Sequence, residues 1–505
     1  MQTEHFDVLI LGAGISGIGA ACHLERQCPG KTYAILERRQ SVGGTWDLFR
    51  YPGIRSDSDM FTFGFNFRPW TEAKVLADGP SIKGYLSETA AQYGVDRHIR
   101  FGTKVTHASW SSEEQRWTVT AETGPEGKVQ VLSCDFLIGA TGYYNYDTPY
   151  RPEFPGEKSF KGQIIHPQHW PENLDYAGKR VVVIGSGATA ITLVPSMAGK
   201  AAHVTMLQRS PTYIMTVPAI DPLSPKLRRF LPEMLVYRIT RTRNVGLQRM
   251  LYQASRRAPK AVKRLLLAQV KAQLGGKVDM KHFTPSYNPW DERLCVVPNG
   301  DLFKALKKGT ASVVTDHIET FTAKGIKLKS GEELEADIII TATGLNVQLL
   351  GGVQVEVDGE RFKPKDHLTY KGVLVEGVPN AAIIIGYTNA SWTLKADIAS
   401  EYICRVLKHM DAKGYGAVVP KSNGDNAVES ETVMGGLSSG YIQRAADNLP
   451  RQGSKRPWKV VHDYVRDVPV LRYSPIEDGA LHFSAKTAGK PDAKAKKSAR
   501  KPQAA

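Results

Sequence analysis

Two continuous apolar runs along the chain, each ending in a glycine-rich turn, predict its architecture. The first run is 8–11 within the segment 6–11 (FDVLIL), and the second is 181–184 within the segment 180–184 (RVVVI). An apolar run without polar alternation is typical of a strand that is buried on both faces. Each run passes into a glycine-rich segment and then into a helix-like segment, so we expect two units of strand, turn and helix.

A second repeated feature supports this division of the chain. The segments 135–142 (DFLIGATG) and 337–344 (DIIITATG) share the pattern DxxIxATG. The economical explanation is an α/β fold with two Rossmann-type dinucleotide-binding domains. The expected organisation is a first domain at 1–147 and 380–480, a second domain at 148–218 and 288–379, a basic helical insertion at 219–287 and a basic disordered tail at 481–505.

The two glycine turns have the spacing of nucleotide-binding fingerprints, GxGxxG and GxGxxA. In this pattern the first glycine permits a tight turn, the second lets pyrophosphate approach the backbone, and the third position lets the helix pack closely on the strand. The positions expected to contact nucleotides are Gly12, Gly14, Ser16 and Gly17 in the first turn, and Gly185, Ser186, Gly187, Ala188, Thr189 and Ala190 in the second.

The residue that ends the next strand distinguishes the two sites. Glu37 lies 20 residues after Gly17, where a carboxylate accepts ribose hydroxyls and repels a 2′-phosphate. The first site is therefore expected to bind FAD. Arg209 lies 19 residues after Ala190, and its guanidinium, with Gln208 beside it, suits the 2′-phosphate of NADPH.

The positive charge of the chain is concentrated in two segments. The formal net charge is +16, but 226–281 alone holds 15 Lys and Arg against Glu233 and Asp279, and the tail is also basic. The remainder of the chain is nearly neutral. Neither basic segment has aromatic residues interspersed among its cations or the sequence pattern of a known nucleic-acid-binding fold. No nucleic-acid partner is therefore expected.

The basic insertion has the periodicity of an amphipathic helix. Val262, Leu266, Val270 and Leu274 recur every four residues after Pro259. Two interpretations stay open. The apolar side packs on the protein while the cations are solvated, or the helix lies on an anionic membrane surface with its apolar side in the interface.

Other features argue against a membrane-spanning or secreted protein. There is no run of 18 apolar residues, and the N-terminus passes into a strand without a secretory signal, which favours a cytoplasmic location. The five cysteines are scattered, with neither CxxC nor metal-type spacing. We therefore expect no metal site, and the lack of a thiol pair disfavours a flavin disulfide reductase.

A dodecapeptide between the two fingerprints indicates a family. Residues 160–171, FKGQIIHPQHWP, have the spacing FxGxxxHxxxWP. This spacing closely resembles the signature of type I Baeyer-Villiger monooxygenases, which use FAD, NADPH and oxygen to convert ketones into esters. The segments 43–46 (GGTW) and 51–59 (YPGIRSDSD) are similar to the same family. The resemblance covers about 5–480 and is closest to the mycobacterial branch that activates the thioamide prodrug ethionamide.

The resemblance implies further cofactor contacts. The positions expected along FAD are Gly44, Thr45, Trp46, Asp47 and Leu48, with the backbone of Val105 beside the adenine. The positions expected where flavin and nicotinamide meet are Arg55, Ser56 and Asp57. The tyrosines of YYNYDTPY (143–150) and Trp392 are candidates for lining a pocket, although buried aromatic side chains usually only pack.

The resemblance also assigns Arg293 as the catalytic residue. Oxygen activation on a flavin requires a fixed cation beside the developing negative charge, and arginine does not lose its proton. Asp57 would orient Arg293. The family often has lysine just before this arginine, whereas this chain has Glu292, so a preference for NADPH would depend more on Arg209.

Gly162, His166 and Trp170 of the dodecapeptide are expected at the junction of the two domains. Histidine titrates near neutral pH, but the expected reaction needs no such base, so we assign His166 a structural role. The expected substrates are ketones or sulfur compounds, with oxygen. A flavin N- or S-monooxygenase without ketone activity and a basic peripheral membrane-binding protein stay open as alternatives, and the sequence leaves the oligomeric state undecided.

Overall fold

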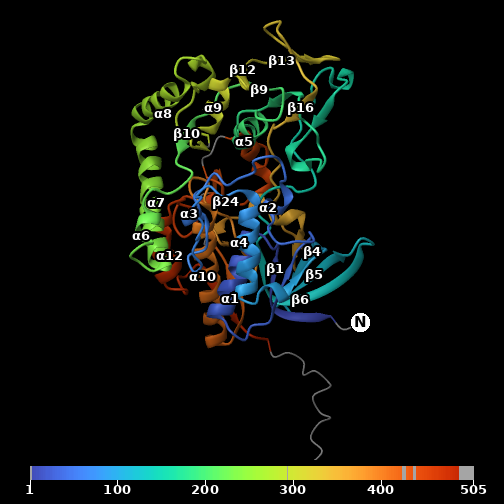
Figure 1. Ribbon diagram of the computed structural model, residues 1–505. Coiled ribbons are helices and arrows are strands. Elements are labelled where there is room, and N and C mark those ends of the chain that lie inside the picture. Colours follow the sequence, from blue (N-terminus) through green and yellow to red (C-terminus); the bar gives the residue numbers. More distant parts are fainter. Residues whose placement is uncertain (1–2, 293, 423–427, 436–438, 488–505) are drawn as a thin grey trace, which may run out of the picture.

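The computed structural model describes residues 3–292, 294–422, 428–435 and 439–487. Two separate sheets organise this part of the chain, a mixed eleven-stranded sheet and a five-stranded sheet. In Figure 1 the five-stranded sheet lies above the larger one, and the long helices α7 (Glu233–Arg257) and α8 (Pro259–Leu274) run along the left side. The expected α/β fold with two Rossmann-type units is confirmed.

The larger sheet grows from the first apolar run of the sequence. Strand β1 (Glu4–Leu11) pairs in parallel with β2 (Tyr33–Leu36) and β6 (Lys128–Gly139), and α1 (Ile15–Gln27) connects β1 to β2. Helices α10 (Trp392–Lys413) and α4 (Gly79–Gln92) pack against α1. The remaining strands of this sheet are β3 (Ile99–Arg100), β4 (Thr103–Ser111), β5 (Arg116–Thr123), β17 (Gln354–Val357), β18 (Glu360–Arg361), β19 (Thr369–Tyr370), β20 (Leu374–Val375) and β21 (Ala381–Ile383).

The smaller sheet is entirely parallel and contains the second apolar run. Its strand order is β12 (Ala311–Thr315), β9 (His203–Gln208), β8 (Arg180–Ile184), β16 (Ile338–Thr341) and β7 (Gln163–Ile165). Strands β8 and β16 lie in the middle and are almost completely buried, which explains their continuous apolar sequences. Helices α5 (Ala188–Met197) and α9 (Asp301–Lys308) belong to this domain and contact each other.

The insertion is helical, as expected. Val262, Leu266, Val270 and Leu274 of α8 are all buried, so this apolar stripe packs on the protein and does not face a membrane. That outcome favours the first of the two interpretations for α8. Among the described residues, no helix is long and apolar enough to cross a membrane.

Two expected domain boundaries are corrected by strand pairing. Residues 354–375 were expected in the second domain, but β17 pairs with β4, and β20 reaches β6 through β21, so this segment belongs to the larger sheet. The tail was expected to begin at 481, but β25 (Leu481–Ala485) pairs with β22 (Tyr415–Pro420), and Phe483 stacks on Tyr415. Short edge strands of this kind carry too few residues to show a clear periodicity. The rest of the tail, 488–505, lies outside the described residues.

The smaller elements complete the chain. They are α2 (Thr45–Leu48), α3 (Met60–Phe63), β10 (Ile214–Val217), α6 (Ser224–Leu227), β11 (Cys295–Pro298), β13 (Ile318–Phe321), β14 (Gly325–Leu328), β15 (Glu333–Glu335), β23 (Val428–Thr432), α11 (Gly440–Arg444), β24 (Arg451–Gly453) and α12 (Tyr464–Tyr473).

Candidate active site

A long cavity begins at the carboxyl end of β1 and extends to the start of α5 in the second domain. The expected residues that line it are Gly12, Gly14, Ser16, Glu37, Gly44, Thr45, Trp46, Arg55, Ser56, Asp57, Val105, Ala188 and Thr189. Val296 of β11 lines it as well. The cavity therefore joins the first fingerprint, the YPGIRSDSD loop and the helix of the second fingerprint in one continuous space.

The first and third fingerprint positions are glycine because backbone atoms approach them. Gly12 has a φ of +99°, and a methyl group at Gly17 would lie 1.8 Å from the Gly12 carbonyl oxygen. A methyl group at Gly12 would lie 3.0 Å from the carbonyl oxygen of Ala140. Gly185, with a φ of +139°, repeats this arrangement, since its methyl group would lie 2.4 Å from the carbonyl oxygen of Ala342. In both halves the DxxIxATG segment thus supports the glycine turn.

A second glycine loop runs beside the first fingerprint. The N–H of Gly43 donates to the carbonyl oxygen of Ala13 at 3.1 Å, and Gly44 has a φ of +55°. A methyl group at Gly44 would lie 3.1 Å from Gly14 Cα, whereas one at Gly14 would meet only ordinary contacts, the nearest at 3.6 Å. Both glycines line the cavity, so a side chain at either position would take up space beside the backbone there. The bare backbone here fits the close approach of a pyrophosphate at the start of α1.

Glu37 closes the other side of this wall. Its side chain is only 4% exposed, and its carboxylate accepts hydrogen bonds from the N–H of Ala13 at 2.7 Å and the N–H of Arg39 at 2.8 Å. Burial raises the pKa of the Glu37 carboxyl, and these two hydrogen bonds oppose the rise. The carboxylate is thus fixed between the fingerprint and the end of β2, where it can accept ribose hydroxyls.

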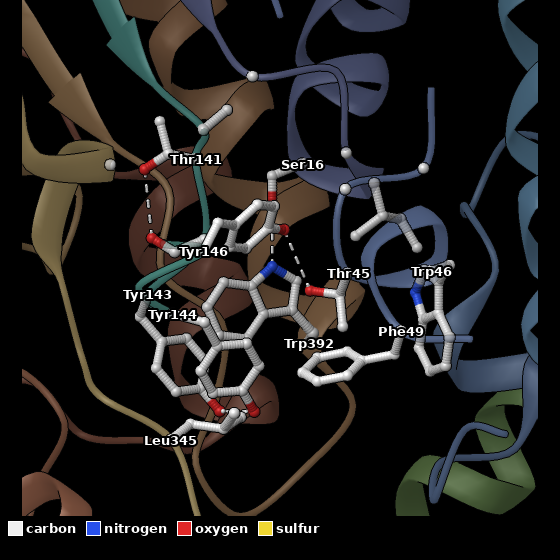
Figure 2. Close-up of a pocket in the computed structure, with 18 of the residues that line it drawn as sticks. Ser16, Thr45, Trp46, Phe49, Thr141, Tyr143, Tyr144, Tyr146, Leu345 and Trp392 are labelled. Atoms are coloured by element: carbon white, nitrogen blue, oxygen red, sulfur yellow. Dashed lines mark hydrogen bonds between the residues drawn. The ribbon is translucent and has the colours of Figure 1, made fainter. Parts of the chain in front are cut away.

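Aromatic side chains form the far part of the cavity (Figure 2). The Nε1–H of Trp392 donates to Ser16 Oγ at 2.8 Å, and its ring stacks on Tyr143 with 5.2 Å between centroids. The hydroxyl groups of Tyr143 and Tyr144 are 2.8 Å apart, and that of Tyr146 is 3.4 Å from Thr45 Oγ1. Trp392 and the first three tyrosines of the 143–150 segment therefore line the pocket, in addition to packing, whereas Tyr150 does not line it.

The YPGIRSDSD loop brings Arg55 to the junction of the two domains. Gly53 lies so close to α5 that a methyl group there would be 1.9 Å from Ser196 Oγ. Arg55 is 10% exposed and donates from Nη1 to Asp301 at 2.7 Å. Its Nη2 is buried and has no hydrogen-bond partner among the described residues. Arg55 therefore has an unsatisfied donor, and both Arg55 and Asp57 line the cavity.

The second fingerprint is more open than the first. Gly187 and Ala188 are exposed, and a methyl group at Gly187 would meet nothing within 4 Å, whereas Ala190 is buried against the sheet. Arg209 is exposed at the end of β9. Burial raises the pKa of the Glu292 carboxyl, and the positive charge of Arg209 opposes the rise, so the two side chains interact.

The dodecapeptide lies at the edge of the smaller sheet and reaches the segment that crosses between domains. A methyl group at Gly162 would lie 2.3 Å from the carbonyl oxygen of Asp337. His166 Nδ1 accepts from the N–H of Gln168 at 3.1 Å, and Gln168 donates to the carbonyl oxygen of Asn145 at 2.9 Å. Burial lowers the pKa of His166 to about 4, so the ring is neutral at neutral pH. His166 does not line the cavity, and nor does Trp170, which packs against the core of the second domain.

Comparison with known proteins identifies the family. A family model described as flavin-binding monooxygenase-like matches residues 73–412, and a model of an NAD(P)-binding Rossmann-like domain matches residues 10–77. The chain belongs to the flavin-binding monooxygenase-like family. These two descriptions confirm a flavin and a nicotinamide cofactor, FAD and NADP(H). The NAD(P)-binding model matches over the first fingerprint, so the assignment of each nucleotide to one fingerprint stays a prediction.

Individual relatives in the family cover nearly the whole chain. A putative FAD-containing monooxygenase, MymA of Mycobacterium tuberculosis, is 60% identical over 488 residues, which are 96% of this chain and 98% of that protein. The FAD-containing monooxygenase EthA of the same organism is 54% identical over 489 residues, covering 96% and 99%. An oxidized steroid monooxygenase bound to NADP matches with a TM-score of 0.75 and 21% identity over 96% of this chain and 100% of that one, a likeness that shows the fold.

Several expected residues of this flavin-binding monooxygenase lie outside the cavity. The Asp47 carboxylate binds Arg39 and Lys83, each at 2.6 Å. Burial alone would raise the pKa of Asp47, but these bonds hold it below its ordinary value, so its charge is already neutralised by protein groups. Gln208 is buried and donates to the carbonyl oxygen of His282 and to Thr315 Oγ1. The other expected residues outside the cavity are Gly17, Leu48, Gly185, Ser186, Gly187, Ala190 and Arg209.

Leu345 and Gln348 are among the positions that line the cavity of this monooxygenase although the sequence did not indicate them. Leu345 directly follows the second DxxIxATG segment, and Gln348 lies three residues further. The Gln348 Oε1 is buried without a hydrogen-bond partner among the described residues. Their place at the carboxyl end of β16 could have indicated them, because ligands bind at that end of parallel strands. Arg293 is outside the described residues.

Proposed function

We propose that the protein is an NADPH- and oxygen-dependent FAD monooxygenase that converts ketones into esters or lactones. The net reaction consumes a ketone, O2, NADPH and a proton and yields the ester, NADP+ and water. One oxygen atom enters the product and the other leaves as water. The observation that supports this most is the continuous cavity, because it lets a flavin held at α1 meet a nicotinamide approaching from α5.

The residues of the first domain would hold FAD. The wall formed by Gly14 and Gly44 would take the pyrophosphate, and the fixed carboxylate of Glu37 would take the ribose hydroxyls. When bound, FAD reduced by NADPH supplies the activated oxygen. The aromatic group of Trp392 and Tyr143 would cover the cavity and exclude water from it.

The residues of the second domain would hold NADPH. The exposed turn at Gly187 leaves room for a pyrophosphate at the start of α5, and Arg209 is available for the 2′-phosphate. Glu292 beside Arg209 would partly oppose that phosphate. We therefore expect NADPH to be preferred, with a margin set by the balance of these two charges.

Three charged side chains would serve the reacting centre. We assign Arg293 to stabilise the developing negative charge and Asp57 to orient it, as the family resemblance implies. The unsatisfied Nη2 of Arg55 supports a polar contact with a bound cofactor, with Asp301 holding the guanidinium in place. His166 would have a structural role, since its ring is neutral and lies outside the cavity. It would hold Gln168 in the position from which Gln168 binds Asn145, in the segment that connects the two domains.

Isotopically labelled dioxygen tests the proposed reaction. The holoenzyme is supplied with NADPH, labelled O2 and a panel of ketones and sulfides, and the products are analysed by mass spectrometry. An ester that carries one labelled atom per molecule is expected from at least one ketone. Label that enters sulfoxides but never an ester would replace the proposal with a flavin S-monooxygenase, and NADPH oxidation without any labelled organic product would leave only a flavin reductase.

Replacing Arg293 tests its assigned role. Arg293→Ala should still allow NADPH to reduce the flavin, because the hydride transfer does not need this cation, while ester formation falls on the order of 100-fold or more. Arg209→Ala serves as the comparison, since it should raise the KM for NADPH and leave the ester yield per NADPH unchanged. Undiminished ester formation by Arg293→Ala would contradict the assignment.

A further inference from the structure

Helix α7 of the insertion is anchored on one side and bare on the other. Its inner side contains Val236, Tyr237, Thr240 and Arg241, all of them buried. The guanidinium of Arg241 donates to the carbonyl oxygens at positions 61, 62 and 64, around the end of α3. This inner contact fixes which side of α7 faces outward, and Figure 1 shows the helix on the left margin of the molecule.

The outward side of α7 carries apolar residues where water-soluble helices usually carry polar ones. Leu235, Ile239, Gly246 and Met250 are separated by four, seven and four residues, so they lie along one stripe of the helix. The side chains of Leu235 and Ile239 are 44% and 39% exposed, and that of Met250 is 63% exposed. No packing within the described chain accounts for this stripe.

Exposed apolar residues gather around this helix. Seven of the twelve large hydrophobic residues that are exposed in the described chain lie within 220–265. This concentration in one stretch of the chain contrasts with the single exposed apolar residues found on any protein surface. The members are Ile220 (54%), Phe230 (85%), Leu235 (44%), Ile239 (39%), Leu247 (51%), Met250 (63%) and Leu265 (67%). The groove between α7 and α12 adds Val465, which is 48% exposed, next to Met250 and Arg257.

The same surface is strongly basic. The only carboxylates within 226–281 are those of Glu233 and Asp279, and Glu233 is already paired with Arg228. Several exposed cations there form no ion pair within the described residues. They are Lys226, Arg229, Arg238, Arg257, Lys260, Arg264 and Lys271. Phe230 directly follows Arg229 in the chain, and Met250 lines the same groove as Arg257. Neither of these two arginines forms an ion pair within the described residues.

We propose that the outward side of α7 docks on an anionic lipid surface. Its arginines would meet the headgroups while Phe230, Leu235, Ile239 and Met250 enter the interface. A second copy of the chain would bring like charges together on this face, and a nucleic acid would leave the apolar side chains in water. The docking element is α7, and the α8 stripe that the sequence suggested plays no part in it, because that stripe is buried.

Vesicle flotation tests this surface on the FAD-loaded full chain. The protein is mixed with vesicles of phosphatidylcholine alone or with vesicles of phosphatidylcholine and phosphatidylglycerol at about 7:3. Flotation with the anionic vesicles only, lost on raising the salt concentration, is expected. Protein that stays with the soluble fraction in both cases would overturn the proposal, and so would equal flotation with neutral vesicles. If the protein binds immobilised polyglutamate but not the anionic vesicles, the partner is an acidic protein and the proposal is wrong.

Two variants and one control distinguish binding through the α7 surface from an effect of the net charge of the protein. The triple variant Arg229→Gln, Arg238→Gln and Arg257→Gln should lower partitioning on the order of 100-fold. The double variant Phe230→Ser and Met250→Ser should lower it on the order of 10-fold or more. The matched control removes the same charge elsewhere. It is the triple variant Lys324→Gln, Lys363→Gln and Lys365→Gln, at exposed positions on other elements.

All the variants should oxidise NADPH at the wild-type rate without vesicles, which shows that they fold. Loss of flotation in the lysine control as large as in the arginine variant would reduce the effect to net charge and overturn the assignment to α7. Unchanged flotation of the Phe230 and Met250 double variant would exclude insertion of the apolar side chains and would likewise overturn it.

Discussion

Gly187→Ala separates nucleotide binding from folding in the second fingerprint. A methyl group at this position would meet nothing within 4 Å, and the backbone there is extended, with a φ of −80° and a ψ of −175° that alanine adopts freely. The folded protein should therefore tolerate the change. The space that the methyl group takes is the space expected for the NADPH pyrophosphate at the start of α5.

The expected loss follows from the hydrogen bonds that a displaced pyrophosphate gives up. A hydrogen bond from a backbone N–H to a charged phosphate contributes about 1.5–3 kcal/mol. Losing one of them corresponds to a rise in the KM for NADPH of roughly 10- to 100-fold. FAD absorbance and Tm should match the unmodified protein, because the added methyl group contacts no other part of the folded chain. Gly185→Ala is the contrasting variant, since its methyl group would lie 2.4 Å from the Ala342 carbonyl oxygen and a φ of +139° disfavours alanine.

Steady-state NADPH oxidation with thermal unfolding of the same samples measures both effects. Gly187→Ala should bind FAD, keep its Tm and lose NADPH affinity, whereas Gly185→Ala should lower the Tm or fail to fold. An unchanged KM for NADPH in a folded Gly187→Ala variant would refute the location of the pyrophosphate at this turn. A lowered Tm for Gly187→Ala would refute the inference that the folded protein has room for a methyl group at this position.

Three further changes test other parts of the site. Ser16→Ala removes the acceptor of the 2.8 Å hydrogen bond from Trp392 and should lower the free energy of unfolding by about 1–3 kcal/mol, measured by urea titration. Because burial lowers the pKa of His166 from 6.5 to about 4, the folded state loses stability as the pH falls from about 6.5 to about 4, and His166→Asn should flatten that loss in Tm. Glu292→Gln removes a negative charge beside Arg209 and should lower the KM for NADPH roughly two- to fivefold, while the KM for NADH stays constant.

The fingerprints were predictable from sequence because their chemistry is local. A strand, a glycine turn and a helix follow one another within 20 residues, so spacing alone indicates Gly12, Gly17 and Gly185. The repeated DxxIxATG segment was visible as a pattern in the sequence, but its structural role could not be inferred from that pattern. Only the fold shows that Ala140 and Ala342 bring their carbonyl oxygens against the first glycine of each turn.

Some contacts could not be predicted because the partner side chains are distant in sequence. Asp47 fits the family pattern, yet Lys83, 36 residues away, neutralises it together with Arg39. Gln208 stands beside Arg209 in sequence, but strand alternation turns it into the protein toward Thr315. Residues 354–375 carry no fingerprint, so their pairing with the larger sheet depends on contacts that no local pattern encodes.

The two proposed nucleotide sites differ in enclosure, and this difference suits the roles that we propose for them. At the first site Glu37 is 4% exposed, and Gly44 approaches Gly14 so closely that a loop covers the fingerprint. At the second site Gly187 is exposed and Arg209 lies at the surface. A cofactor that stays through many turnovers gains from enclosure, whereas one that leaves oxidised after each turnover needs an open path. We therefore expect FAD to remain through gel filtration while NADP+ separates, and co-elution of both in equal amounts would contradict this argument.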